Sequence, residues 1–529
     1  MAAIPLLVPL QNPDIFWHLS AGRFIALYRA VPHQETFSFT FSGAPWYDFE
    51  WLTQLLYYGL YVLAGMPGLW LMKVALLAAC GFVTLRTVKL YALGERWELA
   101  ALVTWSAGAL THSDARPDLF SMLGVAVLLW MLERRRLQHE KWSLPQFAAL
   151  LALFALWANL HAGFAFGLML LGFYWAGAAV FKASGDGGRP RELSAGLAFA
   201  VAGTLFNPYG FGPYRVMAQH WLLRKDLTRF IQEWQPISFH NGYHWPIWPV
   251  MAIFFVLLFR QRKNKNIPLG LCAATLYFAY NAVIHARLAS YFNMTVVVLI
   301  ACLTGESGWL KKPRAGRALA AAALLYAGYL AWAMSLSPWN AVFAGRFVPQ
   351  SAAEFLARER EAVAPLRVYN PWEWGGYLGW KLSPWYRVFS DGRYVFHPLL
   401  AEMMDADSEA GKCQQFFARY GVTGALLRNT DVHFPTSKLY ADGKTKAFAR
   451  PWYLFYMPRE QWALVYWDAQ ALFFVDRHKV PKKWLESHEY RYVRPKDDEA
   501  FAEAVERYEI PLDRVKEEET RHRLEAILY

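Results

Sequence analysis

Long apolar segments recur along most of the chain and are separated by short polar loops. Each segment is long enough, or nearly so, to cross about 30 Å of hydrocarbon as a helix. The ten segments lie at 67–90, 97–112, 116–133, 144–160, 162–182, 193–207, 245–260, 267–285, 287–304 and 316–336. The pattern therefore predicts an α-helical polytopic membrane bundle of about ten or eleven spans over residues 67–337.

The loops between these segments alternate in charge. Short cytoplasmic loops of membrane proteins are rich in Lys and Arg. The basic loops contain Arg96; Arg134–Arg136 with Lys141; Lys182, Arg189 and Arg191; Arg260–Lys265; and Lys311, Lys312, Arg314 and Arg317. We expect these loops to be cytoplasmic, and we expect residues 1–66 and everything after 337 to lie on the outer face.

The pattern changes after residue 337, where short strand-like runs alternate with amphipathic helical stretches. Strands are predicted at 367–370, 387–391, 424–428, 452–457, 463–467 and 471–475, and helices at 351–361, 373–382, 412–420 and within 496–529. Alternation of this kind is typical of a small α/β domain. The predicted division is a first outer loop at 1–66, a transmembrane bundle at 67–337 and an exported α/β domain at 338–529.

Composition supports a membrane protein. Only 18% of residues are charged and 56% are hydrophobic, whereas about a quarter of a soluble globular chain is charged. This excludes a disordered protein and argues against an ordinary soluble enzyme. The net charge of +12 agrees with basic inner loops, and the mixed signs after residue 338 argue against a nucleic-acid surface. The four cysteines show no metal-binding or disulfide pattern.

The amino terminus carries the first candidate site. Met1–Leu10 is apolar but too short to span, which is typical of the end of a truncated first span or of a re-entrant piece. Asp14 follows, and its carboxylate is either a general base or metal ligand, or the N-cap of the next helix. His18 shares a helix face with Asp14.

Further acidic residues come before the first long apolar segment. Asp48 and Glu50 are two residues apart, and with Asp14 they form an oxygen-rich set that suits Mg²⁺ or Mn²⁺. The alternative is a capped interfacial helix with an aromatic belt. Ionisable groups at membrane depth usually face a cavity or a partner, so the concentration of polar residues at the outer ends of the segments favours a cavity that opens outward.

Arginines on the same side are candidates for phosphate binding. Arg116 lies in a tight turn beside a proline, and Arg215 and Arg287 lie in other outer loops. A guanidinium suits a lipid phosphate at the membrane surface. The alternative for Arg116 is a salt bridge with Asp114 or Asp118. His161 lies in the turn Asn-Leu-His-Ala-Gly, for which a structural role is the leading interpretation.

The exported domain opens with an aromatic, acidic and glycine-rich motif. It contains Glu373 and Trp374 within Trp-Glu-Trp-Gly-Gly-Tyr, and Asp391 and Arg393 follow a predicted short strand. These side chains are candidates for a site beside the mouth of the cavity. Aromatic and glycine-rich turns also occur for purely structural reasons. A functional role and a structural role of this motif therefore both stay open.

Together these motifs resemble the GT-C superfamily of membrane glycosyltransferases, which use polyprenyl-phosphate sugars. The Trp-Glu-Trp-Gly-Gly-Tyr motif is similar to the WWDYG-type signature of oligosaccharyltransferase catalytic subunits. The combination looks more closely like a bacterial family of GT-C-like proteins, and the resemblance runs through residues 12–480. The matching motifs are Pro13-Asp14 with Trp17–Leu19, Arg116-Pro117, Asn159–His161, Asn207–Gly210, Trp372–Tyr377 and Asp391–Arg393.

The resemblance implies an outward active site in a bacterial inner membrane, with a periplasmic or extracellular C-terminal domain. Asp14 is then the base or metal ligand with His18 beside it, and the arginines hold the donor phosphate. A glycan, lipid or protein acceptor attacks the anomeric carbon with inversion. Acceptor-binding or supporting roles fall to Asp48, Glu50, His161, Glu373, Trp374, Asp391 and Arg393.

Two other classes of function stay open. The truncated start and the 25 tryptophans are compatible with a non-catalytic GT-C-like subunit that contacts membrane protein partners. A transporter is the third interpretation, but the sequence lacks a repeated pair of broken helices.

Overall fold

The computed structural model describes residues 4–109, 113–180, 189–231, 234–264, 267–305 and 348–528, with a few positions between 321 and 332. The chain forms two compact units. We call Met1–Asn12, Ala21–Pro32 and Tyr47–Ala344 the bundle unit, and Pro13–Ser20, His33–Trp46 and Gly345–Tyr529 the C-terminal unit. The predicted division at residues 66 and 337 stays a prediction.

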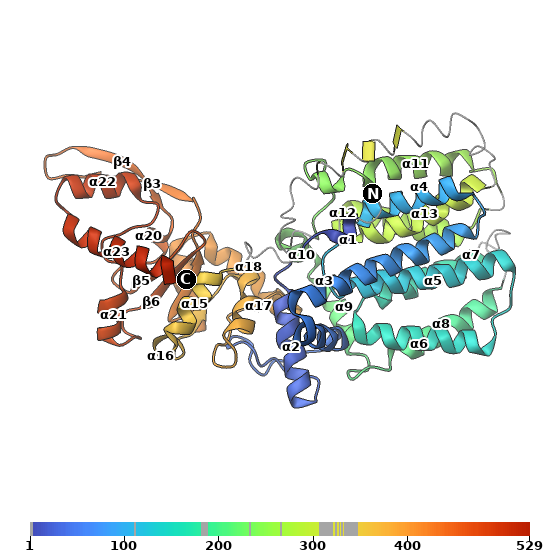
Figure 1. Cartoon of the computed structure of the whole chain (residues 1–529), viewed down its shortest axis with the longest axis horizontal. Helices are drawn as coiled ribbons and strands as arrows, with labels where there is room; N and C mark the ends of the chain where they lie inside the picture. The colour runs from blue at the N-terminus through green and yellow to red at the C-terminus, as the bar shows by residue number, and fades with distance from the viewer. Residues whose placement is uncertain are drawn as a thin grey trace. The chain divides into compact units, whose positions relative to one another are not determined.

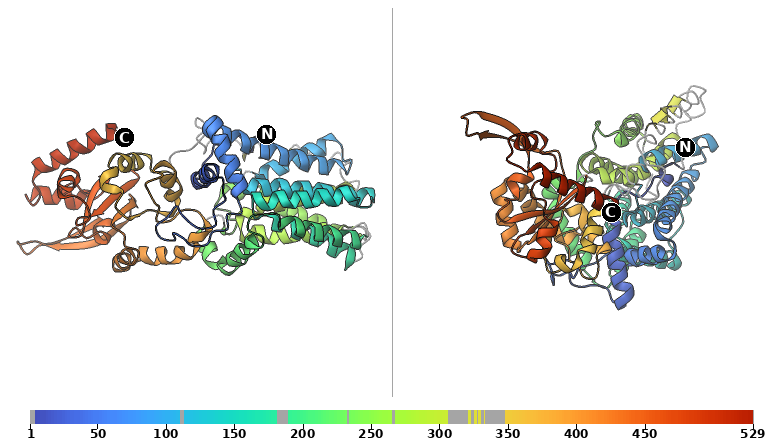
Figure 2. Two further views of the ribbon diagram at one scale, coloured as in Figure 1. Left: turned by 90° about the horizontal axis from the view of Figure 1, so that it is seen from below. Right: turned by 60° about the vertical axis from the view of Figure 1, so that its left-hand side comes forward.

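The bundle unit consists of apolar helices that pack side by side (Figures 1 and 2). The first nine predicted segments coincide with helices, which confirms the helical bundle. The tenth, 316–336, and the basic residues Lys311–Arg317 lie mostly outside the described residues. The main helices are α3 (Trp51–Lys89), α4 (Glu95–Ala109), α5 (Asp118–Gln138), α6 (Leu144–Leu160), α7 (Phe164–Ala179), α8 (Pro190–Thr204), α11 (Ile247–Arg260), α12 (Leu269–Ile284) and α13 (Ala289–Gly305).

Several of these helices have the character of membrane spans. Trp51–Lys89, Gly242–Arg260 and Ala286–Thr304 are long and apolar enough to cross a membrane by length and composition. Three shorter apolar helices, α6, α7 and α12, have 16 or 17 residues. The apolar helices identify a membrane protein, while the count of ten spans and their orientation stay predictions.

Helix α3 starts earlier than the predicted segment. It begins at Trp51. It therefore includes residues before position 67, which one interpretation of the sequence assigned to a capped interfacial helix. The join is a kink, where Gly65 has φ +60° and Pro67 follows. A positive φ is easily adopted by glycine, and proline removes a helical hydrogen bond. Helix α3 therefore consists of two helical segments that meet at a break at Gly65.

Trp157 of α6 fixes the spacing of three helices. A Cβ atom on Gly124 of α5 would lie 2.8 Å from its ring, and one on Gly167 of α7 would lie 2.6 Å away. The indole Nε1 donates to Ser121 Oγ at 2.7 Å. Small residues that admit a large neighbour are typical of helix packing in membranes. This packing sets the position of His161, which follows α6.

The C-terminal unit is an α/β domain, as predicted. Its main sheet has the order β1-β2-β6-β5, with β1 parallel to β2 and the other pairs antiparallel. The strands are β1 (Val368–Tyr369), β2 (Gly424–Arg428), β5 (Trp462–Trp467) and β6 (Ala471–Asp476). The helices are α15 (Gln350–Arg358), α16 (Arg360–Val363), α17 (Trp372–Lys381), α18 (His397–Asp407), α19 (Ala410–Tyr420), α20 (Tyr453–Tyr456), α21 (Lys482–His488), α22 (Asp498–Glu506) and α23 (Leu512–Leu528).

Two predicted strands are wrong. Residues 452–457 contain the helix α20, and 387–391 contribute only a bridge between Ser38 and Val388. A separate hairpin, β3 (His433–Leu439) with β4 (Thr445–Pro451), was not predicted. Its side chains are mostly exposed, so its strands lack the buried apolar positions by which a sequence pattern reveals a strand. The hairpin extends from the main sheet (Figure 1).

Two segments from the predicted first outer loop belong to the C-terminal unit. Phe39 N donates to Val388 O at 3.2 Å, and Val388 N donates to Phe37 O at 3.0 Å. Thr40 Oγ1 donates to Phe389 O at 2.5 Å. The segment 33–46 is therefore an extra layer of this unit, and Pro13–Ser20, the start of helix α2 (Ile15–Tyr28), belongs to it as well.

A histidine is one of several contacts that join the β3–β4 hairpin to the rest of the C-terminal unit, and we expect this contact to depend on pH. His433 Nδ1 and Nε2 lie 2.9 Å from the carbonyl oxygens of Asp431 and Lys496. Carbonyls only accept, so both ring nitrogens donate when the ring is charged, and these bonds raise the pKa of His433. The resulting stabilisation is complete below the unfolded pKa of about 6.5 and is lost as pH rises through the folded value.

We therefore expect hydrogen-exchange protection of the hairpin to fall between about pH 6 and pH 8, after correction for intrinsic exchange rates. His433→Ala removes this fall, and His478→Ala, at an exposed histidine in the same unit, leaves it unchanged. Equal protection at both pH values in the wild type contradicts the role of His433.

Candidate functional site

Three separate motifs of the sequence meet within the C-terminal unit. They are Pro13–His18, Trp372–Tyr377 and Ser390–Arg393, and we call them the motif cluster. A Cβ atom on Gly392 would lie 2.1 Å from Asp14 Oδ1 and 3.0 Å from Trp17 Nε1. A Cβ on Gly376 would lie 3.2 Å from Trp17 N. The glycines thus allow the backbone of two motifs to approach Asp14 and Trp17 closely.

Asp14 sits at the start of α2 and is half-buried. Its backbone carbonyl accepts hydrogen bonds from Trp17 N at 3.1 Å and His18 N at 3.3 Å. His18 is buried, and its ring lies 3.6 Å from that of Trp17. The Phe16 and Tyr377 rings meet edge to face at 4.9 Å. Helix α2 therefore presents Asp14 and Trp17 to the glycines, while His18 packs against Trp17.

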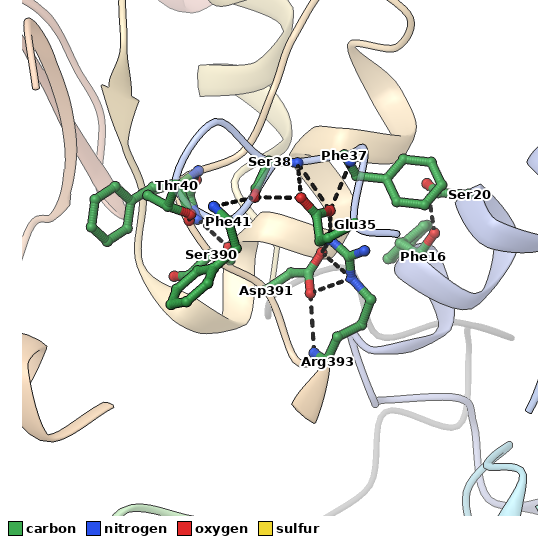
Figure 3. A network of polar contacts seen from close by, with 12 residues as sticks. Phe16, Ser20, Glu35, Phe37, Ser38, Thr40, Phe41, Ser390, Asp391 and Arg393 are labelled. Atoms are coloured by element: carbon green, nitrogen blue, oxygen red, sulfur yellow. Dashed lines mark hydrogen bonds and ion pairs between the residues drawn. The ribbon is translucent and has the colours of Figure 1, made fainter. Parts of the chain in front are cut away.

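Arg393 is the centre of a buried ion network that holds this loop (Figure 3). It is 2% exposed. Its Nε and Nη2 donate to the two oxygens of Asp391, each at 2.8 Å. Nη2 also lies 3.0 Å from Glu35 Oε1. Burial alone lowers the pKa of Arg393, but the charges of Asp391 and Glu35 outweigh burial and raise it above its ordinary value.

The sequence analysis did not identify Glu35 as a site residue. In the structure this side chain is 0% exposed. Its carboxylate accepts from Phe37 N at 2.7 Å and from Ser38 Oγ at 2.6 Å. No spacing in the sequence relates it to Arg393. The network joins the segment 33–46 to the loop that contains Gly392, so Arg393, Asp391 and Glu35 are positioning residues for the contact with Asp14.

Glu373 and Trp374 of the same motif lie at the start of α17. Glu373 is exposed and pairs with Arg428 at 2.6 Å. Trp374 is buried, and the Arg428 guanidinium lies 5.8 Å from the centre of its ring. Both residues therefore belong to the motif cluster, with Glu373 on its accessible side and Trp374 in its core.

The bundle unit holds a second set of predicted residues, connected by polar contacts. His161 Nε2 lies 3.6 Å from Glu50 Oε1, and its Nδ1 lies 3.6 Å from Asp118 Oδ1. Ser121 Oγ is 2.7 Å from His161 Nδ1. Tyr291 donates to Asp118 at 2.5 Å. His161 is therefore held by protein partners, and both its structural role and its role in supporting an acceptor stay predictions.

The predicted arginines differ in their surroundings. Arg116 is half-buried and interacts electrostatically with Tyr57, as do Glu50 and Asp114. The carboxylate of Asp114 accepts from Gln11 N at 2.9 Å and Asn12 N at 2.7 Å.

The other two arginines each contact an aromatic side chain. Arg287 lies over the Trp234 ring at 5.7 Å and interacts with Tyr291, the partner of Asp118. Arg215 is exposed and donates to Tyr47 at 3.3 Å. Contacts through Tyr291 and Asp118 thus connect Arg287 to His161 and Glu50. Arg215 contacts Tyr47, the residue before Asp48 in the chain.

The set of Asp14, Asp48 and Glu50 expected to bind a metal stays a prediction. Within the described ranges, no group of three or more His, Cys, Asp and Glu side chains is placed to hold an ion. Asp48 is 2% exposed and accepts from Gln54 Nε2 at 2.6 Å, and Glu50 lies beside His161. Asp48 and Glu50 thus have protein partners in the bundle unit. The assignment of Mg²⁺ or Mn²⁺ to Asp14, Asp48 and Glu50 stays a prediction, and no step below involves a metal.

An open groove lies beside the second set. It has a volume of about 580 Å³ and is lined by Trp51, Leu52, Leu156, Asn159, Leu205, Phe206, Asn207 and Pro208. The side chains of Asn159 and Asn207 hydrogen-bond to backbone carbonyls. Asn159 Nδ2 donates to Phe206 O, and Asn207 Nδ2 donates to Gly210 O. The two asparagine turns therefore shape a mainly apolar groove wall.

The combination of a helical membrane bundle with an α/β domain is shared with solved structures of other proteins. Two structures of the oligosaccharyltransferase AglB from Archaeoglobus fulgidus are similar. One, in complex with an inhibitory peptide and a dolichol-phosphate, gives a TM-score of 0.52 at 12% identity over 84% of this chain and 71% of that chain. The other, tethered to an acceptor peptide containing the NVT sequon, gives 0.54 at 11% over 84% and 70%.

Sequence comparison adds no closer relative. No protein-family model and no curated protein matches the chain. At these identities the structural likeness establishes the fold, and function has to be argued from the residues of the site.

Proposed function

We propose that this protein is an integral-membrane glycosyltransferase that moves a sugar from a polyprenyl-phosphate donor to an acceptor on the outer face of a bacterial inner membrane. The observation that carries the proposal is the motif cluster, in which two glycine-containing motifs from the C-terminal unit approach Asp14. The AglB structures, one solved with a dolichol-phosphate and the other with an acceptor peptide, support a lipid donor and a separate acceptor.

In the proposed reaction, Asp14 is the general base. It takes the proton of the acceptor hydroxyl or amide as the acceptor atom attacks the anomeric carbon of the sugar. The new glycosidic bond forms on one face, and the carbon–oxygen bond to the phosphate breaks on the opposite face, with inversion. The polyprenyl phosphate leaves with the electron pair of that bond. A carboxylate in this role typically contributes a rate factor of about 10²–10⁴.

The donor phosphate is assigned to Arg116, with Arg215 and Arg287 as further cationic groups. Guanidinium groups bind phosphate oxygens in pairs and do not lose their charge. The apolar groove between Trp51 and Asn207 is the proposed path of the polyprenyl chain. Glu373, on the accessible side of its motif, is proposed to contact the acceptor.

Mass spectrometry of lipids retained by the gently purified protein tests the donor site. The expected result is a retained polyprenyl phosphate in the wild type and its loss in Arg116→Ala. Arg134→Ala, at an exposed arginine of helix α5, is the matched control and keeps the lipid. Bulk phospholipid alone in the wild type, together with a stoichiometric protein partner, favours the non-catalytic subunit and contradicts the proposal.

A further inference from the structure

The C-terminal unit contains a cavity of its own, separate from the groove of the bundle unit. The lining of this cavity includes no residue of the motif cluster. It has a volume of about 370 Å³ and lies against β5, β6 and the segment 489–494. Arginines dominate its charged lining, with Glu489 as the acidic residue. The four arginines are Arg459, Arg477, Arg491 and Arg494. We call this cavity the arginine pocket.

Two carboxylates near this pocket are each shared by more than one guanidinium. Glu489 accepts from Arg477 Nη1 at 3.1 Å and from Arg491 Nε at 3.0 Å. Asp497, which does not line the pocket, binds Arg450 at 2.6 Å and lies 3.7 Å from Arg494 Nη1. Four arginines therefore share these two carboxylates, and Arg459 is a fifth guanidinium at the pocket. The carboxylate of Glu518 accepts from the backbone N–H groups of Arg491 and Val493. Five positive charges thus stand against three negative ones, which leaves an excess of positive charge.

Arg459 and Arg494 carry most of this excess. The described residues supply no hydrogen-bond acceptor for the buried Nε of Arg494. Arg459 Nη1 donates only to a neutral acceptor, Arg491 O, at 3.1 Å. Burial lowers the pKa of both groups, and the charge of Arg450 lowers them further. Arg459 is exposed and Arg494 is half-buried, so the free-energy cost of burying a guanidinium without a matching anion falls on Arg494.

We infer that the arginine pocket binds a small molecule bearing a phosphate group. Guanidinium groups match the oxygens of phosphate in geometry and charge, and an anion here compensates the excess charge that Glu489, Asp497 and Glu518 leave. Cavities that bind small molecules measure about 300–1,000 Å³, so a volume of about 370 Å³ suits a compact ligand. This site does not depend on the proposed glycosyl transfer.

Calorimetric titration of the full-length, detergent-purified protein tests the inference in phosphate-free buffer. The probes are inorganic phosphate, glucose 6-phosphate and glycerol 3-phosphate, and glucose is the neutral control. Saturable binding of the phosphates is expected. Arg494→Gln and Arg459→Gln each weaken it about tenfold or more. Arg419→Gln, at an exposed arginine of α19 paired with Glu402 at 3.0 Å, leaves the affinity unchanged.

The outcomes separate this pocket from the proposed donor site. Phosphate binding that persists in Arg116→Ala and weakens in the Arg459 and Arg494 variants supports the arginine pocket. A preference for glucose 6-phosphate identifies a sugar phosphate, and a preference for glycerol 3-phosphate identifies a lipid headgroup. No saturable phosphate binding, equal affinity for glucose, or wild-type affinity in both pocket variants overturns the inference. The second pocket variant decides the matter if one of them fails to fold.

Discussion

Replacing Arg393 by methionine is expected to destabilise the C-terminal unit by about 3–5 kcal/mol, because removing one partner of a buried ion network leaves uncompensated charge in the interior. Glu35 and Asp391 are 0% and 2% exposed, so water does not replace the guanidinium. Methionine retains much of the volume and the apolar contact with Phe37, Trp46 and Phe396, which surround the Arg393 guanidinium at 4.9–5.2 Å. The loss is therefore electrostatic.

Thermal unfolding of the purified full-length protein, followed by tryptophan fluorescence, measures this effect. Arg419→Met is the matched control, because its exposed pair with Glu402 is of the kind worth about 0–1 kcal/mol. Adding Glu35→Gln and Asp391→Asn to Arg393→Met recovers part of the lost stability, since the unpaired charges are then removed. Equal shifts in Arg393→Met and Arg419→Met would refute the buried network as the source of stability.

The parts of the fold that the sequence predicted are those set by local pattern. The helices of the bundle follow from the length of apolar runs, and β2, β5 and β6 follow from short apolar runs between turns. The pattern failed at Tyr453–Tyr456, where an aromatic run forms a helix, because burial alone does not distinguish a short strand from a single helical turn. It also failed at the exposed hairpin.

The candidate site was predictable only residue by residue. Asp14, Trp374, Asp391 and Arg393 stand out as chemistry-bearing residues in short motifs, but their convergence depends on contacts between segments far apart in the chain. Glu35 gives no local signal, because its partner Arg393 lies in another domain of the predicted division. Closeness in sequence also does not fix the partners of a side chain: Asp48 accepts from Gln54, and Glu50 lies beside His161.

Asp14→Asn is expected to lower the rate of sugar transfer by about 10²–10⁴-fold, the usual contribution of a general base. The change also separates the two interpretations of Asp14. Asparagine caps a helix about as well as aspartate, so a merely structural Asp14 leaves both activity and stability intact. Asp405→Asn, at an exposed carboxylate of α18 paired with Lys412 at 2.6 Å, is the matched control and keeps full activity.

Gly392→Ala tests the same carboxylate without removing it. The added methyl group would lie 2.1 Å from Asp14 Oδ1, so Asp14 has to move away from the Ser390–Arg393 loop. Both variants are assayed by the release of free polyprenyl phosphate from the co-purified sugar lipid, with membrane extract as the source of acceptor. Loss of release in both, with retained lipid and a wild-type melting temperature in Asp14→Asn, assigns the base. Unchanged release in Asp14→Asn removes Asp14 from the reaction and leaves the motif cluster as a purely architectural contact.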